Sequence, residues 1–162
     1  MEFPKATPEH ELLTKMVGEW TFESEAVMGP DQPPMKGTGT ESVRKIGDLW
    51  VVGEWDGMMP GCDVNMKSII TLGYDPMKNR FVGSFIASVM THMWLYDGSL
   101  DSATRTLTLD TVGPSFDDPN VMAKYQDVVR FIDDDHRTLT SRLQNNDGSW
   151  MEFMKMTVTR TK

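Results

Sequence analysis

Apolar and polar positions alternate along most of the chain, a pattern typical of β-strands that bury one face. The clearest example runs from Trp20 to Met28, where Trp20 and Phe22 fall on one side and Glu23 and Glu25 on the other. A period of two predicts a half-buried strand here. The same criterion predicts nine further strands, at residues 36–46, 50–56, 66–74, 80–89, 92–97, 106–112, 124–132, 137–144 and 150–160.

Turn signals separate the predicted strands. Residues 47–48, 97–98 and 145–148 are rich in Gly, Asp and Asn, and the longest predicted loop spans 113–120. Short strands at roughly 8–12-residue spacing indicate an all-β sandwich or barrel. Because no helical crossover separates them, neighbouring strands should be antiparallel. Closure removes the exposed edges of so wide a sheet, so we expect one antiparallel up-and-down β-barrel domain over residues 1–162.

One segment, residues 8–17, has helical periodicity instead. Thr7 is a suitable N-cap, and Pro8 occupies the first helical position, where its missing N–H costs nothing. Apolar side chains recur every three to four residues, at Leu12, Leu13, Met16 and Val17. Gly18 follows as a residue that commonly ends a helix. We therefore expect a short amphipathic helix ahead of the first strand.

Gly18-Glu19-Trp20 lies directly after the predicted helix and opens the first predicted strand. It resembles the G-x-W signature of the calycins, which include lipocalins and fatty-acid-binding proteins. In that family the tryptophan closes one end of the barrel, and a basic residue of the last strand packs over its ring. By position Arg160 matches that residue, and the resemblance implies a cation–π contact worth about 0.5–2 kcal/mol. Trp20 and Arg160 are thus expected to close the barrel rather than to carry function.

The whole chain also resembles a bacterial family of uncharacterised lipocalin-like domains. The matching segments are residues 16–20, 72–75, 125–128 and 159–160. That family has no established common activity. The resemblance therefore implies a fold and leaves the function to be argued from the residues.

Charge and composition narrow the classes of partner. The formal net charge is −8 and the 16 basic residues form no Lys/Arg-rich tract, which argues against nucleic-acid binding. No apolar run approaches the roughly 20 residues of a membrane helix, and residues 1–5 lack the pattern of a signal peptide. The single cysteine, Cys62, allows no intramolecular disulfide. We expect a cytoplasmic protein without a membrane partner.

The barrel interior is the expected place for function, since barrels of this size enclose one small ligand. Methionine is frequent, 14 of 162 residues, and its flexible thioether fills irregular cores or lines adaptable binding surfaces. The candidates for lining a cavity are aromatic, Met and Arg side chains: Phe22, Trp55, Phe85, Trp94, Arg130, Met154 and Met156. They predict a site for a small hydrophobic or amphipathic molecule.

Arg130 is the charged member of this set and sits in an otherwise apolar strand, residues 128–132. An inward guanidinium without a partner would be costly, and a ligand carboxylate would satisfy it in bidentate geometry. In the alternative, Arg130 faces water or pairs with Asp127 or Glu152, because alternation places half of every strand outside. The sequence leaves both arrangements open.

Few other residues are candidates for catalysis or for binding a cofactor. Glu54 or Asp127 would suit a metal-independent enzyme, such as an isomerase or hydrolase, if it faced the interior with a shifted pKa. His92, beside Met93 and Trp94, is a candidate axial ligand for haem, although a surface role is commoner for such a histidine. The zinc-helix pattern H-E-x-x-H is incomplete, and no metal site, cofactor or catalytic residue is assigned.

These observations support hypotheses from different classes. The leading one is a barrel that binds a small hydrophobic or amphipathic ligand, for which a carboxylate is one option. An enzyme using the same cavity and a haem-binding barrel are alternatives. A further alternative is a protein-interaction module, with an exposed apolar patch that forms a homodimer.

Overall fold

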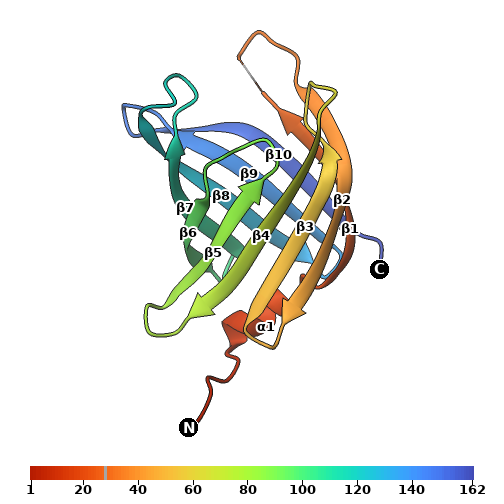
Figure 1. Cartoon of the computed structure of the whole chain (residues 1–162), viewed down its shortest axis with the longest axis vertical. Helices are drawn as coiled ribbons and strands as arrows, with labels where there is room; N and C mark the ends of the chain where they lie inside the picture. The colour runs from red at the N-terminus through yellow and green to blue at the C-terminus, as the bar shows by residue number, and fades with distance from the viewer. Residues whose placement is uncertain (28) are drawn as a thin grey trace.

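The computed structural model describes residues 1–27 and 29–162, which form a closed ten-stranded antiparallel barrel with one short helix. Each strand pairs with its neighbours in the chain, and β1 also pairs with β10, which closes the barrel (Figure 1). The predicted all-β, up-and-down architecture is confirmed. The elements are α1 (Pro8–Thr14), β1 (Gly18–Ala26), β2 (Met35–Ile46), β3 (Trp50–Met58), β4 (Asn65–Asp75), β5 (Arg80–Ala87), β6 (Trp94–Asp101), β7 (Thr106–Pro114), β8 (Met122–Asp133), β9 (His136–Gln144) and β10 (Trp150–Arg160).

The predicted strands correspond one to one with these elements, and β6 differs most. Asp97-Gly98 was predicted to end the strand at residue 97, but both residues pair within the sheet and β6 continues to Asp101. Gly98 serves packing instead: a Cβ there would lie 2.8 Å from Leu109 and 3.1 Å from Phe81. A glycine inside a strand can mark close approach by a neighbour and not a turn. Met28, predicted to end the first strand, lies outside the described residues.

Helix α1 lies across one end of the barrel, beside the ends of β3 and β4 (Figure 1). It ends at Thr14, not at residue 17 as predicted, because the following amides bond three residues back: Met16 N–H to Leu13 O (2.9 Å) and Val17 N–H to Thr14 O (3.2 Å). Such tightening is common at helix ends. Buried His10 fixes the helix, since its Nε2 lies 3.0 Å from the carbonyl oxygen of Tyr74 on β4.

Apolar packing fills the half of the barrel nearest α1, which we call the closed half. Leu13 and Met16 enter it from the helix segment. The strands contribute buried side chains at the corresponding level, namely Val43, Val51, Leu72, Phe81, Leu107, Phe131 and Val158. Burying each large aliphatic or aromatic side chain contributes about 1.5–3 kcal/mol. The barrel is thus plugged at one end, and an interior ligand would have to enter from the other.

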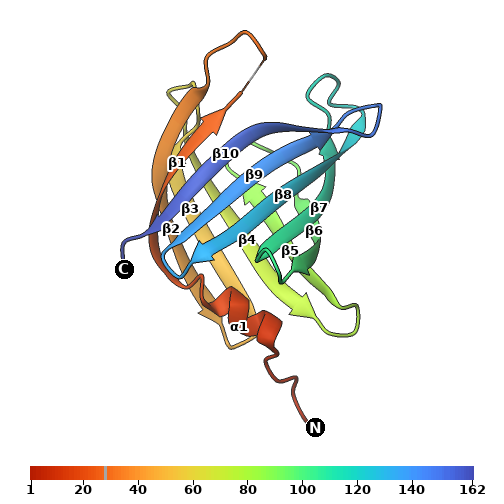
Figure 2. The same ribbon diagram turned by 180° about the vertical axis from the view of Figure 1, so that it is seen from behind.

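We call the half of the barrel farthest from α1 the open half. The long loops between β1 and β2, β3 and β4, and β7 and β8 lie at this end (Figures 1 and 2). The predicted long loop at 113–120 is found at 115–121, between β7 and β8. Within the described part of the chain, no helix is long and apolar enough to cross a membrane.

Candidate binding site inside the barrel

Two arginines close the barrel around Trp20. The centroid of the indole lies 4.1 Å from the guanidinium carbon of Arg160 and 4.3 Å from that of Arg137. The indole Nε1 donates to the carbonyl of Met16, at 2.9 Å. The resemblance implied one basic residue at this ring, and the second, Arg137, was not anticipated. These contacts join β1, β9 and β10 to the end of the helix segment.

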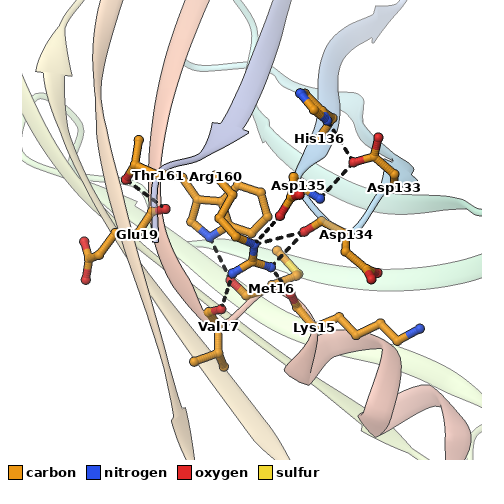
Figure 3. Close-up of polar contacts among 11 residues, drawn as sticks. Lys15, Met16, Val17, Glu19, Asp133, Asp134, Asp135, His136, Arg160 and Thr161 are labelled. Carbon is orange, nitrogen blue, oxygen red and sulfur yellow. Dashed lines mark hydrogen bonds and ion pairs between the residues drawn. The ribbon is translucent and has the colours of Figure 1, made fainter.

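Arg160 also donates hydrogen bonds to several backbone carbonyls at this end of the barrel (Figure 3). It donates to the carbonyls of Val17 and Lys15, each at 2.7 Å, and to that of Asp134. The Arg160 guanidinium packs directly against Gly18, which has a φ of +142°. A Cβ at position 18 would collide with Arg160 Nη1. The glycine of the G-x-W signature is therefore required by close approach, and Arg160 has a structural role.

Arg137 and Glu41 form a buried ion pair in the barrel interior, through Arg137 Nη2 and Glu41 Oε2. Burial raises the pKa of Glu41, and the facing guanidinium opposes that shift. An arginine keeps its proton in proteins, so Glu41 faces a positive charge. A space of about 10 Å³ adjoins Arg137, enough for one water. Neither residue was predicted from the sequence, although alternation places Glu41 on the same face as Val43.

Several predicted cavity-lining side chains face the open half. Trp55, Phe85, Trp94 and Met154 belong to the inward set, yet each remains partly exposed. Phe85 lies opposite Trp94 across β5 and β6, and the Trp55 ring contacts Phe22, with centroids 5.5 Å apart. Phe22 and Met156 lie deeper and are buried in the core. Solvent therefore reaches part of these inward-facing residues in the open half.

Two of the predicted residues face outward. Arg130 is exposed, while its neighbours Val129 and Phe131 are buried, so the inward arrangement considered from the sequence is wrong. Glu54 is likewise exposed and lies 3.9 Å from Arg44. Alternation explains both outcomes. In a continuous apolar run, the sequence does not reveal whether the odd-numbered or the even-numbered residues face the core.

Of the two acidic residues predicted as catalytic candidates, Asp127 is the one that faces the interior. Its carboxylate accepts hydrogen bonds from the Tyr96 hydroxyl (2.5 Å) and the Ser141 hydroxyl (2.6 Å). Burial raises the pKa of Asp127, and the two hydroxyl donors partly offset that shift. The residue as a whole is partly exposed. A carboxyl group in such a position can recognise, or exchange a proton with, a molecule inside the barrel.

Five buried side-chain polar atoms have no hydrogen-bond partner among the described residues: Glu41 Oε1, Trp55 Nε1, Ser68 Oγ, Thr111 Oγ1 and Arg137 Nη1. Buried polar groups normally have partners, so each such atom calls for an explanation. Three of them are direct cross-strand neighbours, since Glu41 pairs with Trp55 and Trp55 with Ser68. The inner wall thus has two polar regions, one on β2–β4 and the Asp127 cluster on β6, β8 and β9.

His92 lies at the rim of the open end, next to Trp94. Its Nε2 lies 2.9 Å from the carbonyl of Val112, where it is placed to donate, so only Nδ1 is free to ligate haem iron. Its role as a haem ligand stays a prediction. Among the described residues, no group of three or more His, Cys, Asp or Glu is arranged to hold a metal.

The outer surface has a hollow of about 540 Å³ over β2–β5. Ile69 and Ile86 face each other across its floor. Charged groups at its edge pair with each other, as Lys67 does with Asp56 at 3.7 Å. Trp55 and Ser68 also contribute to the lining of this hollow. Strand alternation directs their side chains inward, and their unpartnered polar atoms are buried, so we place the candidate site inside the barrel.

Comparison with one solved structure supports the fold. The crystal structure of Rv2717c from M. tuberculosis aligns over 98% of this chain and 100% of that chain, with a TM-score of 0.61 and 10% identity. The structure of EF1p2_mFAP2b bound to DFHBI aligns over 94% and 98%, with a TM-score of 0.45 and 11% identity. The comparison with curated proteins gives no match. A family model described as "Protein of unknown function (DUF1579)" matches residues 5–160, and the chain therefore belongs to this family.

Proposed function

We propose that the protein binds one small, largely apolar molecule in the open half of the barrel, with a hydrogen-bonding group of that molecule at Asp127. The observation that carries the proposal is the Asp127 carboxyl group on the inner wall, held by Tyr96 and Ser141, in a barrel whose inward aromatic residues remain partly exposed. An apolar pocket with a few placed polar groups is the usual form of a small-molecule site.

The charges favour a ligand that donates a hydrogen bond over a carboxylate. Arg130, the group considered for a carboxylate, is outside. Arg137 is inside but is paired with Glu41. An ionised ligand carboxylate near Asp127 would meet a like charge, which is unfavourable in a region of low dielectric. A hydroxyl, amide or amine would instead complete the lone pairs of Asp127.

The test uses N-phenyl-1-naphthylamine, a neutral fluorescent probe with an apolar body and one N–H donor. Titration should give saturable binding of one probe per chain. Replacing Asp127→Leu should weaken binding about 10- to 150-fold, the range for one charge-assisted hydrogen bond. Ser99→Ala, on the exposed face of β6, serves as the control and should leave the affinity unchanged. Non-saturable binding, or equal affinity of wild type and Asp127→Leu, would refute the proposal.

The same carboxyl group favours a second candidate, an enzyme that transfers a proton to or from a bound molecule. Burial raises the pKa of Asp127, the direction that suits a carboxyl group for acid–base catalysis near neutral pH. Hydrogen–deuterium exchange at the α-carbon of 2-tetralone tests this candidate. Asp127 would take the α-proton and return a deuteron from solvent. NMR should show faster exchange with the wild type than with Asp127→Asn, and equal rates would exclude the role.

A further inference from the structure

Exposed apolar side chains surround the open end of the barrel. Alternate loops of an up-and-down barrel share one end, and the five loops here span residues 27–34, 59–64, 88–93, 115–121 and 145–149 (Figures 1 and 2). We call these loops and the strand ends beside them the mouth rim. Exposed apolar patches commonly mark a binding surface. Each loop or its neighbouring strand contributes a large apolar residue that is about half exposed, for example Val27, Val64, Met93, Val121 and Met151.

Contacts between aromatic rings make one side of the mouth rim continuous. Trp94 on β6 packs edge-to-face against Tyr125 on β8, with ring centroids 5.0 Å apart. Phe116, in the loop between β7 and β8, contacts both Tyr125 (5.7 Å) and Phe153 on β10 (5.0 Å). The carbonyl of Phe153 accepts a hydrogen bond from the amide of Val27, at 2.9 Å, which extends the row to the end of β1. Phe116 is 62% exposed, and Trp94 and Phe153 are half-buried, so solvent reaches part of this row.

The charged side chains of the five rim loops are all acidic. Their sequences contain no Lys or Arg. One of the carboxylates acts on the aromatic row itself, since burial raises the pKa of Tyr125 and the nearby Asp117 adds to that shift. Apolar and negatively charged groups are thus combined on one surface. The acidic residues are five exposed aspartates, Asp31, Asp63, Asp117, Asp118 and Asp147.

This combination selects the kind of partner. A second copy of the chain would bring a rim of like charge, and each chain has a formal net charge of −8. Anionic lipid head groups would be repelled for the same reason. A protein that presents apolar side chains beside Arg or Lys complements both properties. An arginine is especially suited, because its planar guanidinium stacks on a ring such as Phe116 and also pairs with a carboxylate such as Asp117.

We propose that the mouth rim is a docking surface for another protein, one that presents an apolar face bordered by Arg or Lys. This inference goes beyond the proposed function, since it concerns the outer edge of the barrel and not its interior. The rim surrounds the end through which an interior ligand would have to enter. A docked partner would therefore cover that entrance.

A designed peptide serves as the probe, an amphipathic helix with leucine on one face and arginine on the other. Its counterpart carries glutamate in place of every arginine. Fluorescence anisotropy of the labelled peptides, titrated with the intact protein, should show saturable one-to-one binding of the arginine peptide and no binding of the glutamate peptide. Hydrogen–deuterium exchange should slow in the rim loops and not in turns of the opposite end, such as residues 76–79 and 102–105.

Matched variants test the apolar contribution. Val121→Ser/Met122→Ser removes two rim side chains that are each 53% exposed. Ile46→Ser/Ile132→Ser is the control, since these residues are 54% and 52% exposed at the opposite end. The rim variant should weaken binding of the arginine peptide about 10-fold, and the control should leave it unchanged.

A second pair of variants tests the charge. Asp117→Asn/Asp118→Asn and its control, Asp101→Asn/Asp134→Asn, remove the same formal charge from exposed positions at opposite ends of the barrel. Only the rim variant should weaken binding, by about 3- to 10-fold. Because the net charge is matched, a general attraction between an acidic protein and a basic peptide would instead give equal losses.

Equal losses in the rim and control variants, slowed exchange at the opposite end, or no binding of the arginine peptide would overturn the proposal. Two further outcomes would also overturn it, each by naming a different occupant. Rim-dependent binding to vesicles of phosphatidylcholine and phosphatidylglycerol, in place of peptide binding, would make the rim a membrane-docking surface. Rim-dependent dimerisation in sedimentation velocity, in place of peptide binding, would make it a self-association surface.

Discussion

The guanidinium of Arg137 meets the carboxylate of Glu41 across the barrel interior, with the two side chains only 4% and 0% exposed. The partners are 96 residues apart in the chain and come from β9 and β2. The other side of Arg137 faces the ring of Trp20. Closure of the barrel therefore brings together a charge pair and a cation–π pair that share one guanidinium.

Glu41→Ala should be among the most destabilising single changes in the protein. It leaves the Arg137 charge buried without its partner, and breaking a buried pair costs about 3–5 kcal/mol. The double variant Glu41→Leu/Arg137→Met should recover most of that loss, since an apolar replacement of both partners is often neutral or stabilising. Urea unfolding gives both values. A double variant as unstable as Glu41→Ala would show that the cost comes from shape and not from the orphaned charge.

Arg160→Lys should destabilise the protein by about 2–3 kcal/mol, although it keeps the positive charge. A lysine lacks the planar fork that stacks on Trp20 and reaches the carbonyls of Val17 and Lys15 together. Each hydrogen bond contributes about 1 kcal/mol and the stack a similar amount. Arg44→Lys, at an exposed surface pair, is the control and should stay within about 0.5 kcal/mol of wild type. Equal losses in the two variants would mean that charge alone matters at position 160.

Alternation was sufficient to predict the ten strands and the barrel, because a period of two and short turns leave few other architectures. The turn at Asp97-Gly98 was misassigned, since Gly and Asp mark turns on average but here Gly98 makes room for Leu109. Local sequence does not distinguish a glycine that turns the chain from one that admits a neighbour.

The candidate site was only partly predictable. Aromatic and Met side chains on the inward face follow from alternation, whereas the facing of Arg130 depends on a parity that its apolar neighbours do not reveal. The cluster of Tyr96, Asp127 and Ser141 depends on register across three strands, with partners 31 and 14 residues apart. Such contacts are set by sheet pairing and leave no local pattern.

Tyr96→Phe removes one donor to Asp127 and should cost about 1.5–3 kcal/mol at neutral pH, the range for a hydrogen bond to a charged group. The loss should shrink in acid, where a protonated carboxyl group needs the donor less. Tyr74→Phe is the matched control, because its hydroxyl is exposed and lies 3.5 Å from Asn79, so its effect should be near zero. Chemical denaturation at two pH values measures both. A pH-independent loss would contradict an ionised Asp127 at neutral pH.

Asp127→Asn should become more stabilising, or less destabilising, as the pH rises. Burial raises the pKa of Asp127 above its ordinary value of 3.8, so the native state keeps a proton over a range in which the unfolded chain has lost it. Stability then falls as the pH rises through that range, by about 1.4 kcal/mol for each unit by which the pKa is raised. Asparagine does not titrate and lacks this slope.

The quantity to measure is the difference in unfolding free energy between Asp127→Asn and wild type from pH 4 to pH 8. Other titrating groups act on both proteins alike, so the difference isolates Asp127. It should rise with pH and then level off above the native pKa. Glu152→Gln, on the exposed face of β10, should give a flat difference. A difference that falls with pH would mean that the hydrogen bonds from Tyr96 and Ser141 outweigh burial, and Asp127 would then be a fixed anion better suited to a cationic ligand.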